Sequence, residues 1–188
     1  MPGTAVVAPA GLVPEDGMAS STIMRAMVTP DRASECLRVV RSVAEWAAEQ
    51  RDIVGVAIVG SWAREQARMD SDLDLVILTD DRERYLSDGA WARAVLGEPA
   101  ELIRTQRWGP LTERRVALPS GLEIEFGFVP PGWASVDPVD PGTARVVADG
   151  CSPLLDPQGA FTRLISAVGD PERRLGGMPM RRSGHPSP

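Results

Sequence analysis

Two short apolar runs, 53–59 and 72–79, constrain this chain more than any other feature of its sequence. The first, IVGVAIV, is rich in β-branched residues, and the second, DLDLVILT, begins by alternating Asp with Leu. Runs this short predict buried strands, because a helix with the same degree of burial is usually longer. Gly60-Ser61 ends the first run, and we expect a short helix over 62–68 before the second strand.

The sequence around this unit predicts a mixed α/β domain. Thr29 is a suitable helix cap with Pro30 at the first helical position, and apolar residues then recur at helical spacing. A further helix is expected over 89–97, followed by apolar runs that Pro- and Gly-containing turns separate. The runs 101–108, 111–118 and 122–129 are expected strands, and 142–148 and 158–168 are expected short helices. This order indicates an α/β (α+β) fold with a mixed β-sheet flanked by helices.

Composition divides the chain into a folded region and two tails. Both ends are rich in Pro, Gly and Ser and show no clear period, which is typical of segments without a packed core. We expect tails over 1–28 and 170–188, a core over 29–130 and a short C-terminal helical extension over 131–169. The core and extension together are long enough for one domain with a hydrophobic interior.

The inventory of side chains excludes several reaction types. All twenty basic residues are Arg, Asn is absent, and the only His is His185 near the C-terminus. A Walker loop or a Schiff-base enzyme needs Lys, and Ser-His-Asp or Cys-His catalysis needs a His inside the fold. Cys36 and Cys151 lie far apart with no His beside them, which disfavours a zinc site. Carboxylates, hydroxyls, backbone amides, Arg and a hard metal ion remain.

Net charge and the arrangement of apolar residues limit the partners of the protein. The charge is −6 and the pI is about 4.9, which disfavours a long nucleic acid. No basic residue precedes Arg25, and no apolar run approaches the roughly 20 residues of a membrane-spanning helix. The two cysteines suit a reducing compartment. We therefore expect a cytoplasmic protein that does not contact a membrane.

Asp72 and Asp74 form a candidate metal site. Residues two apart on a strand project from the same face, so both carboxylates are expected about 6–7 Å apart at the backbone. Such a pair repels itself unless a cation lies between its members, and Mg²⁺ prefers oxygen ligands of this kind. Leu73 and Leu75 would then face the core. A strand with a solvated acidic face is the alternative interpretation.

The Gly60-Ser61 turn is a candidate phosphate site. Backbone amides at the start of a helix favour phosphate oxygens, Gly60 permits close approach of a ligand, and Ser61 adds a hydroxyl donor. A Gly-Ser turn alone is a common structural feature. Its position just before the paired carboxylates favours a site for a phosphorylated ligand.

These motifs resemble those of the polymerase-β-like nucleotidyltransferases, most closely the small bacterial branch of minimal and aminoglycoside nucleotidyltransferases. The resemblance rests on GSWAR at 60–64 and SDLDL at 71–75, and it extends over about 53–129. It implies that Gly60, Ser61 and Arg64 bind a nucleoside triphosphate such as ATP. It also implies that Asp72, Asp74 and a third carboxylate bind Mg²⁺ and direct transfer of a nucleoside monophosphate with loss of pyrophosphate.

The third carboxylate is expected on the strand LEIEFGFV. Glu123 and Glu125 share a face by the period of two. The resemblance favours Glu125, which precedes apolar residues and a Pro, while Glu123 stays open as a neighbouring ligand or a solvated partner. Metal-assisted in-line transfer needs neither His nor Lys, in agreement with the inventory above.

The sequence also suggests roles for Glu65 and for several Arg and Trp residues. The family often has Gly where Glu65 stands, and a carboxylate there would repel a triphosphate unless it points away or pairs with Arg64 or Arg68. The remaining arginines of the meander are interpreted as solvated or paired with Glu, and three tryptophans as packing residues. These are Arg104, Arg107, Arg114 and Arg115, and Trp62, Trp108 and Trp133.

The predicted function is Mg²⁺-dependent nucleotidyl transfer to a hydroxyl group of a small molecule or a protein. Two alternatives stay open: an antitoxin-type partner of the same fold that binds or nucleotidylates a toxin, and a catalytically silent nucleotide-binding domain. The extension after the core is short beside the acceptor domain usual in aminoglycoside enzymes. No acceptor base is assigned, and Asp137 and Asp140 are only nearby acids.

Overall fold

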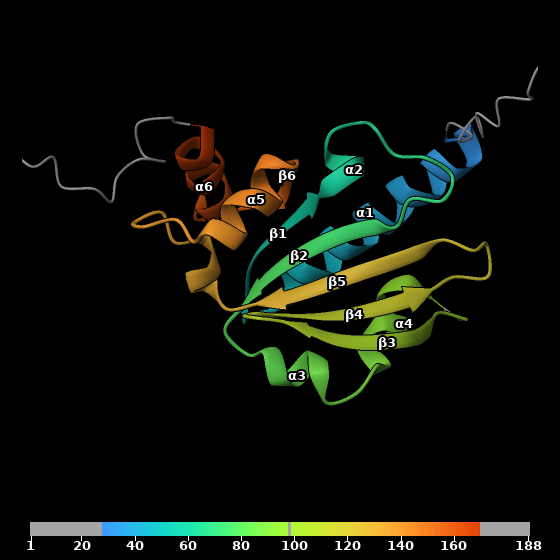
Figure 1. Cartoon of the computed structure of the whole chain (residues 1–188). Helices are drawn as coiled ribbons and strands as arrows, with labels where there is room; N and C mark the ends of the chain where they lie inside the picture. Colours follow the sequence, from blue (N-terminus) through green and yellow to red (C-terminus); the bar gives the residue numbers. More distant parts are fainter. Residues whose placement is uncertain (1–27, 98, 170–188) are drawn as a thin grey trace, which may run out of the picture.

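The computed structural model describes residues 28–97 and 99–169 and shows a six-stranded mixed sheet flanked by helices (Figure 1). The strands are β1 (Ile53–Val59), β2 (Leu73–Thr79), β3 (Glu101–Trp108), β4 (Leu111–Ala117), β5 (Glu123–Val129) and β6 (Cys151–Leu155). The helices are α1 (Pro30–Glu49), α2 (Gly60–Ala63), α3 (Arg82–Leu86), α4 (Ala90–Leu96), the 3₁₀ turn η1 (Pro131–Ala134), α5 (Pro141–Ala148) and α6 (Ala160–Gly169). The predicted fold class is confirmed.

The sheet has the order β3-β4-β5-β2-β1-β6. Only β2 and β5 pair in parallel, and every other neighbouring pair is antiparallel. The parallel pair lies in the middle of the sheet, where both strands begin at the same edge. Side chains near the start of β2 and of β5 are therefore brought together.

Alternate residues of β2 enter two separate hydrophobic cores. Leu73, Leu75 and Ile77 pack with α1 and α4 on one face, whereas Val76 and Leu78 pack with α5 and α6 on the other. Figure 1 shows α1 and α4 behind the sheet and α5 and α6 in front of it. This period of two places Asp74 on the second face, as the sequence predicts.

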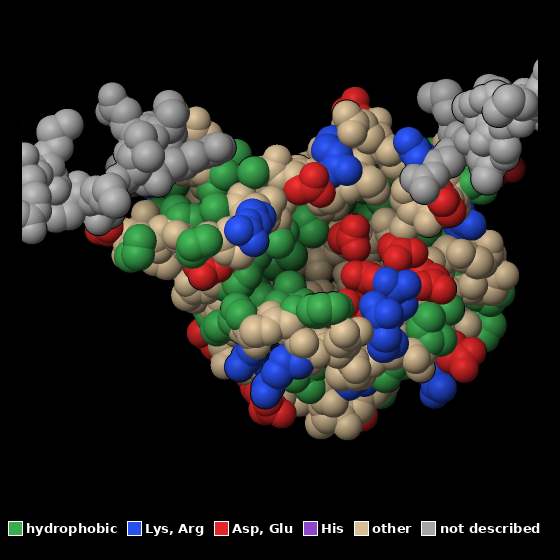
Figure 2. Space-filling view, viewed as in Figure 1, with side chains coloured by type: hydrophobic (Ala, Val, Ile, Leu, Met, Phe, Trp, Pro, Cys, Tyr) green, Lys and Arg blue, Asp and Glu red, His purple; other side chains and the backbone are tan. Residues whose placement is uncertain are grey.

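The second face is only partly covered. Its core joins β1 and β2 to η1, α5 and α6, but β3 is mostly exposed along its length. Figure 2 shows the resulting hollow, with hydrophobic side chains inside it and acidic side chains along one border. The open part of this face is the natural place for a ligand.

Three local predictions differ from the structure. The short helix expected over 62–68 is wrong: α2 covers Gly60–Ala63, and Glu65 then adopts a left-handed backbone with φ 58°, which ends the turn. The sequence analysis also missed α3. It missed β6 as well, because Pro153 weakens the strand signal. As an edge strand paired only with β1, β6 tolerates this proline.

The start of α1 forms as predicted. The Thr29 side chain accepts a hydrogen bond from the Arg32 backbone amide at 3.3 Å, and Pro30 occupies the first turn. None of the described helices is both long and apolar enough to cross a membrane. The predicted tails over 1–28 and 170–188, together with His185, lie outside the described residues except for Val28.

A partly buried hydrogen-bond cluster around Asp52 joins the start of β1 to the end of β2 and to α3. The Tyr85 hydroxyl donates to Asp52 Oδ2 at 2.7 Å, Thr79 Oγ1 donates to the same oxygen at 2.9 Å, and Arg84 donates to Oδ1 at 2.7 Å. Tyr85 is 1% exposed. Burial alone would raise the pKa of Asp52, but the hydrogen bonds from Tyr85 and Thr79 outweigh it and hold this pKa below 3.8.

We expect Asp52→Ala to lower the free energy of unfolding by about 2 kcal/mol at pH 7, because the buried Tyr85 hydroxyl loses its acceptor. Since the folded state lowers the pKa of Asp52, its stabilisation is complete above 3.8 and is lost as the pH falls below that value. Urea unfolding at neutral and acidic pH measures both effects. Asp52→Asn, which keeps an acceptor oxygen, should lose less. Equal losses in both variants at every pH would contradict the assignment.

Candidate functional site

The predicted acidic residues gather where β1 ends and where β2 and β5 begin. Asp74 is the direct partner of Glu125 in the parallel pairing and of Val59 in the antiparallel pairing. Asp72 directly precedes β2. The structure therefore brings Asp72, Asp74 and Glu125 to one end of the open sheet face, although what these residues bind stays a prediction.

Gly60 connects the predicted phosphate turn to these carboxylates. It has φ 68°, and a Cβ atom at this position would lie 3.0 Å from Asp74 Oδ2. Its amide donates to the Gly150 carbonyl at 3.1 Å, and a Cβ at Gly150 would lie 2.9 Å from the Gly60 carbonyl oxygen. Glycine is favoured at Gly60 by its positive φ and the nearby carboxylate, and at Gly150 by the close backbone contact.

Arg64 anchors the same turn to the end of α5. Its guanidinium forms an ion pair with Asp149 Oδ2 at 2.5 Å and also donates to the Asp149 carbonyl. Its Nε donates to Gln66 at 3.2 Å. Arg64 is therefore partly a structural residue, and its partner Asp149 was not predicted from the sequence.

A polar pocket of about 470 Å³ lies beside the turn. Two predicted nucleotide-binding residues, Ser61 and Arg64, line it. Its other lining residues are Gln66, Arg68, Asp70 and Ser71. Glu65 is exposed and is not among the lining residues, so its carboxylate does not face this pocket. The pocket has hydroxyl and guanidinium groups that can donate hydrogen bonds to phosphate oxygens.

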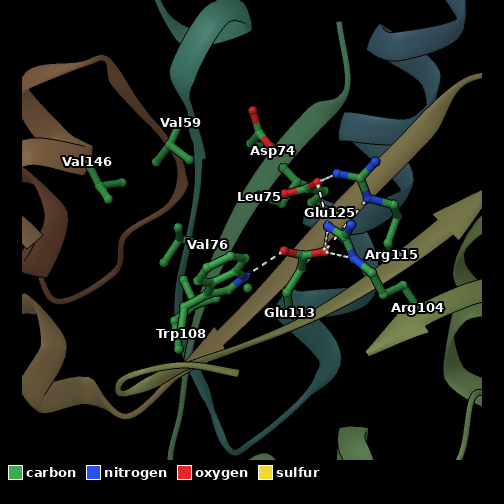
Figure 3. Close-up of a pocket in the computed structure, with 12 residues that line it drawn as sticks. Val59, Asp74, Leu75, Val76, Arg104, Trp108, Glu113, Arg115, Glu125 and Val146 are labelled. Carbon is green, nitrogen blue, oxygen red and sulfur yellow. Dashed lines mark hydrogen bonds and ion pairs between the residues drawn. The ribbon is translucent and has the colours of Figure 1, made fainter. Parts of the chain in front are cut away.

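Arg115 lies among the predicted metal ligands. Its guanidinium contacts Asp72 Oδ2 at 3.0 Å, Glu123 Oε2 at 2.5 Å, and Glu125 (Figure 3 shows the contact with Glu125). It comes from β4, where it is the direct neighbour of Glu125 in the antiparallel pairing. One guanidinium thus partly neutralises three carboxylates of the site.

A second Arg–Glu pair lies next to this cluster. Arg104 donates to Glu113 Oε1 at 2.5 Å and approaches Glu125 at 3.5 Å. Glu113 is only 4% exposed, and its other oxygen accepts a hydrogen bond from Trp108 Nε1 at 3.0 Å. These contacts agree with the interpretation of Arg104 and Arg115 as partners of Glu.

The carboxylates nevertheless carry an excess of negative charge. Burial, followed by the charge of Asp72, raises the pKa of Asp74 to about 6, and Arg115 offsets only part of this. Burial also raises the pKa of Asp72 despite the nearby Arg115. Ionised carboxylates held this close are costly without further positive charge, so the site favours a cation.

The donor set suits Mg²⁺, which prefers carboxylate oxygens. Across residues 28–97 and 99–169, no three Asp, Glu, His or Cys side chains stand in an arrangement ready to hold a metal ion. The Arg115 guanidinium forms ion pairs with carboxylate oxygens of both Asp72 and Glu125. A metal ion would therefore compete with Arg115 for these oxygens.

The sequence contained an unused signal for Arg115. Leu118 N–H donates to the Leu122 carbonyl across the Pro119-Ser120-Gly121 turn. This short turn fixes the pairing of β4 with β5, so that each residue of β4 faces the residue of β5 whose number makes a sum of 240 with its own. This register places Arg115 opposite Glu125. Trp108 carried no comparable signal: it was interpreted as packing, but it is 55% exposed.

Comparison with known proteins supports one family. Residues 40–117 match the sequence profile of the nucleotidyltransferase domain. Over this range the chain is similar to nucleotidyltransferase domains. A search of curated proteins finds no match to the sequence. One solved structure, described as a cytoplasmic RNA terminal U-transferase, is similar over 55% of this chain and 31% of its own, with 15% identity and a TM-score of 0.42.

The profile of the nucleotidyltransferase domain includes the Gly60-Ser61 turn, Asp72 and Asp74 but ends before β5. Within the domain, nucleotidyl transfer is thus the general activity that the family supports. The position of Glu125 beside Asp74 comes from the strand register and not from the profile.

Proposed function

We propose that this chain is a Mg²⁺-dependent nucleotidyltransferase that moves a nucleoside monophosphate from a triphosphate, such as ATP, to a hydroxyl group. The acceptor hydroxyl would belong to a small molecule or a protein. In this proposal the residues that hold the metal and direct catalysis are Asp72, Asp74 and Glu125. The residues that bind the triphosphate are Gly60, Ser61 and Arg64.

The position of Asp74 carries this proposal. On one side its carboxylate lies 3.0 Å from the position that a Cβ atom of Gly60 would occupy. On the other side Asp74 pairs with Glu125 of the neighbouring strand β5. Residues that favour phosphate and residues that favour a divalent cation are thus adjacent. A site for a metal–triphosphate complex requires both.

The proposed reaction is an in-line displacement at the α-phosphorus. The acceptor oxygen forms a bond to this phosphorus, the bond between the phosphorus and the α–β bridging oxygen breaks, and pyrophosphate leaves with the electron pair. The hydroxyl proton passes to solvent. Bound Mg²⁺ supplies electrostatic stabilisation of the oxygens that gain charge. The guanidinium groups of Arg64 and Arg68 supply positive charge on the side of the leaving group.

The test is pyrophosphate release from each of ATP, GTP, CTP and UTP with Mg²⁺, together with a calorimetric titration of each nucleotide. The acceptor panel contains aminoglycosides, simple alcohols and host proteins, and α-labelled nucleotides report whether the label moves to a small molecule or to a protein. We expect Mg²⁺-dependent binding and release. Binding without release for any acceptor would instead support a silent nucleotide-binding domain, and absence of both would contradict the proposal.

Glu65→Gly is expected to leave the affinity for Mg·ATP within about twofold of wild type, because an exposed charge outside the pocket is largely screened. Asp70→Asn is the matched comparison, since it also removes one negative charge but at a residue that lines the pocket. We expect tighter binding in that variant. A large gain in affinity from Glu65→Gly in the same titration would show that its carboxylate faces the phosphates.

A further inference from the structure

We propose that the hollow on the open sheet face binds the acceptor, and that the acceptor is a small molecule with a flat apolar ring next to its hydroxyl group. This inference rests on the proposed nucleotidyl transfer and specifies its second substrate. The hollow is a pocket of about 490 Å³, a size typical of small-molecule sites.

The pocket has one charged end and one apolar end (Figure 3). Asp74, Glu125, Arg104 and Arg115 form the charged end. On the apolar side, Val146 lies across the pocket from Trp108, and Val59 lies beside its strand partner Asp74. A ligand that fills this pocket therefore has an apolar part that contacts the apolar residues and a polar group that lies beside the carboxylates.

Trp108 is exposed but oriented. The residue is 55% exposed, so it is not a core residue, yet its Nε1 donates to Glu113 at 3.0 Å. Glu113 is itself buried and held by Arg104. An indole fixed at the border of a pocket offers a flat surface on which a planar ring can stack at low entropic cost.

The floor of the pocket is apolar, and the Leu111 side chain packs against the backbone at Gly127. A Cβ atom at this position would lie 2.9 Å from Leu111 Cδ1, so no larger residue fits without displacing Leu111. Val76, the next inward-facing position on β2, completes the floor. The apolar floor and the indole of Trp108 together favour a planar apolar ring over a polyhydroxylated or polycationic sugar.

The position of this pocket along β2 assigns it to the acceptor. The polar pocket includes Ser71, before the strand, whereas the apolar pocket includes Asp74 and Val76, further along it. In an in-line displacement the attacking oxygen and the leaving group lie on opposite sides of the phosphorus. With pyrophosphate at Ser61 and Arg64, the attacking hydroxyl enters from the apolar pocket.

The probe for the test is 2-naphthylethanol, a flat apolar ring that carries a primary alcohol. In full-length ¹⁵N-labelled protein, the five tryptophans give indole N–H signals, and Trp108→Phe assigns that of Trp108. We expect the probe to shift this signal and myo-inositol, a ring with hydroxyl groups but no apolar face, to leave it unchanged. No shift with the probe, or a larger shift with myo-inositol, would overturn the ring class.

Two variants on opposite walls test the location. Trp108→Ala removes the stacking surface and Val146→Asp places a charge at the apolar end, and each should weaken probe binding by about tenfold. Leu37→Asp, the same kind of change on an exposed position of α1, is the matched control and should bind the probe as wild type does. Wild-type affinity in both pocket variants would contradict the proposal.

Titration with Mg·ATP separates this inference from the proposed function. We expect Mg·ATP and the probe to bind together and Trp108→Ala to keep its affinity for Mg·ATP. Displacement of the probe by Mg·ATP would assign the pocket to the nucleoside and overturn the acceptor role. Nucleotide turnover without probe binding would refute only the assignment of the pocket to the acceptor. Probe binding without any nucleotide binding would refute the proposed transferase function.

Discussion

Asp74→Asn is expected to reduce nucleotidyl transfer by a factor on the order of 10³, the largest effect among single substitutions in this protein. Asp74 is the one predicted ligand that contacts the Gly60 turn and also pairs in register with Glu125. The amide keeps the size of the side chain but removes the negative charge that a metal ion requires. Pyrophosphate release under saturating nucleotide measures the loss.

The stability of the same variant distinguishes loss of chemistry from loss of fold. Asp74 lies beside Asp72 in a partly buried site, and the two charges repel each other. Removal of one charge relieves this repulsion, so Asp74→Asn should not unfold at a lower urea concentration than wild type. Asp80→Asn, on an exposed acid just after β2, is the matched control and should keep full activity. Equal activity in both variants would refute the metal assignment.

Gly60→Ala is expected to have the second-largest effect, a loss of about 10²-fold in transfer rate. The new Cβ would lie 3.0 Å from Asp74 Oδ2, so either the turn or the carboxylate must move. The residue also holds φ 68°, which L side chains adopt only at a cost of about 1–2 kcal/mol. Both the affinity for Mg·ATP and the rate should therefore fall.

Gly121→Ala separates these two contributions. Gly121 has φ 77° in the turn between β4 and β5, and a Cβ there would meet no atom within 4 Å. The substitution thus imposes a similar backbone strain at a distance from the predicted site. We expect both alanine variants to lose stability and only Gly60→Ala to lose transfer. A similar rate in the two variants would mean that close packing against Asp74 is not needed.

Much of the fold was predictable because its signals are local. The bounds of β1 and β3 agree with the predicted runs 53–59 and 101–108, since the composition of a short run and the turn that ends it lie within a few residues. The prediction was wrong over 62–68, where Glu65 takes a left-handed conformation that its residue type does not signal. β6 was missed because its strand character comes from pairing with β1 and not from its own sequence.

The candidate site was predictable only in part for the same reason. The alternation of Asp with Leu placed Asp72 and Asp74 on one face, and the structure agrees. The short turn between β4 and β5 indicates that Arg115 faces Glu125, but no local pattern indicated that Arg115 would also reach Asp72 or that Trp108 would border a pocket. Both facts depend on how the β3–β4–β5 meander pairs with β2 and on where α5 and α6 leave the sheet open.

Local residue patterns predicted five of the six described strands, the glycine turn and the pair of acids that follows it. The two acids could be placed on one face because side-chain direction on a strand has a period of two whatever surrounds it. Three features follow from the folded arrangement alone: Glu125 stands beside Asp74, a Cβ atom at Gly60 would meet the Asp74 carboxylate, and an apolar pocket continues from the acidic end. These are relations between segments distant in the chain. Strand register and the burial of two separate cores establish them, and neither is encoded in a single stretch of residues.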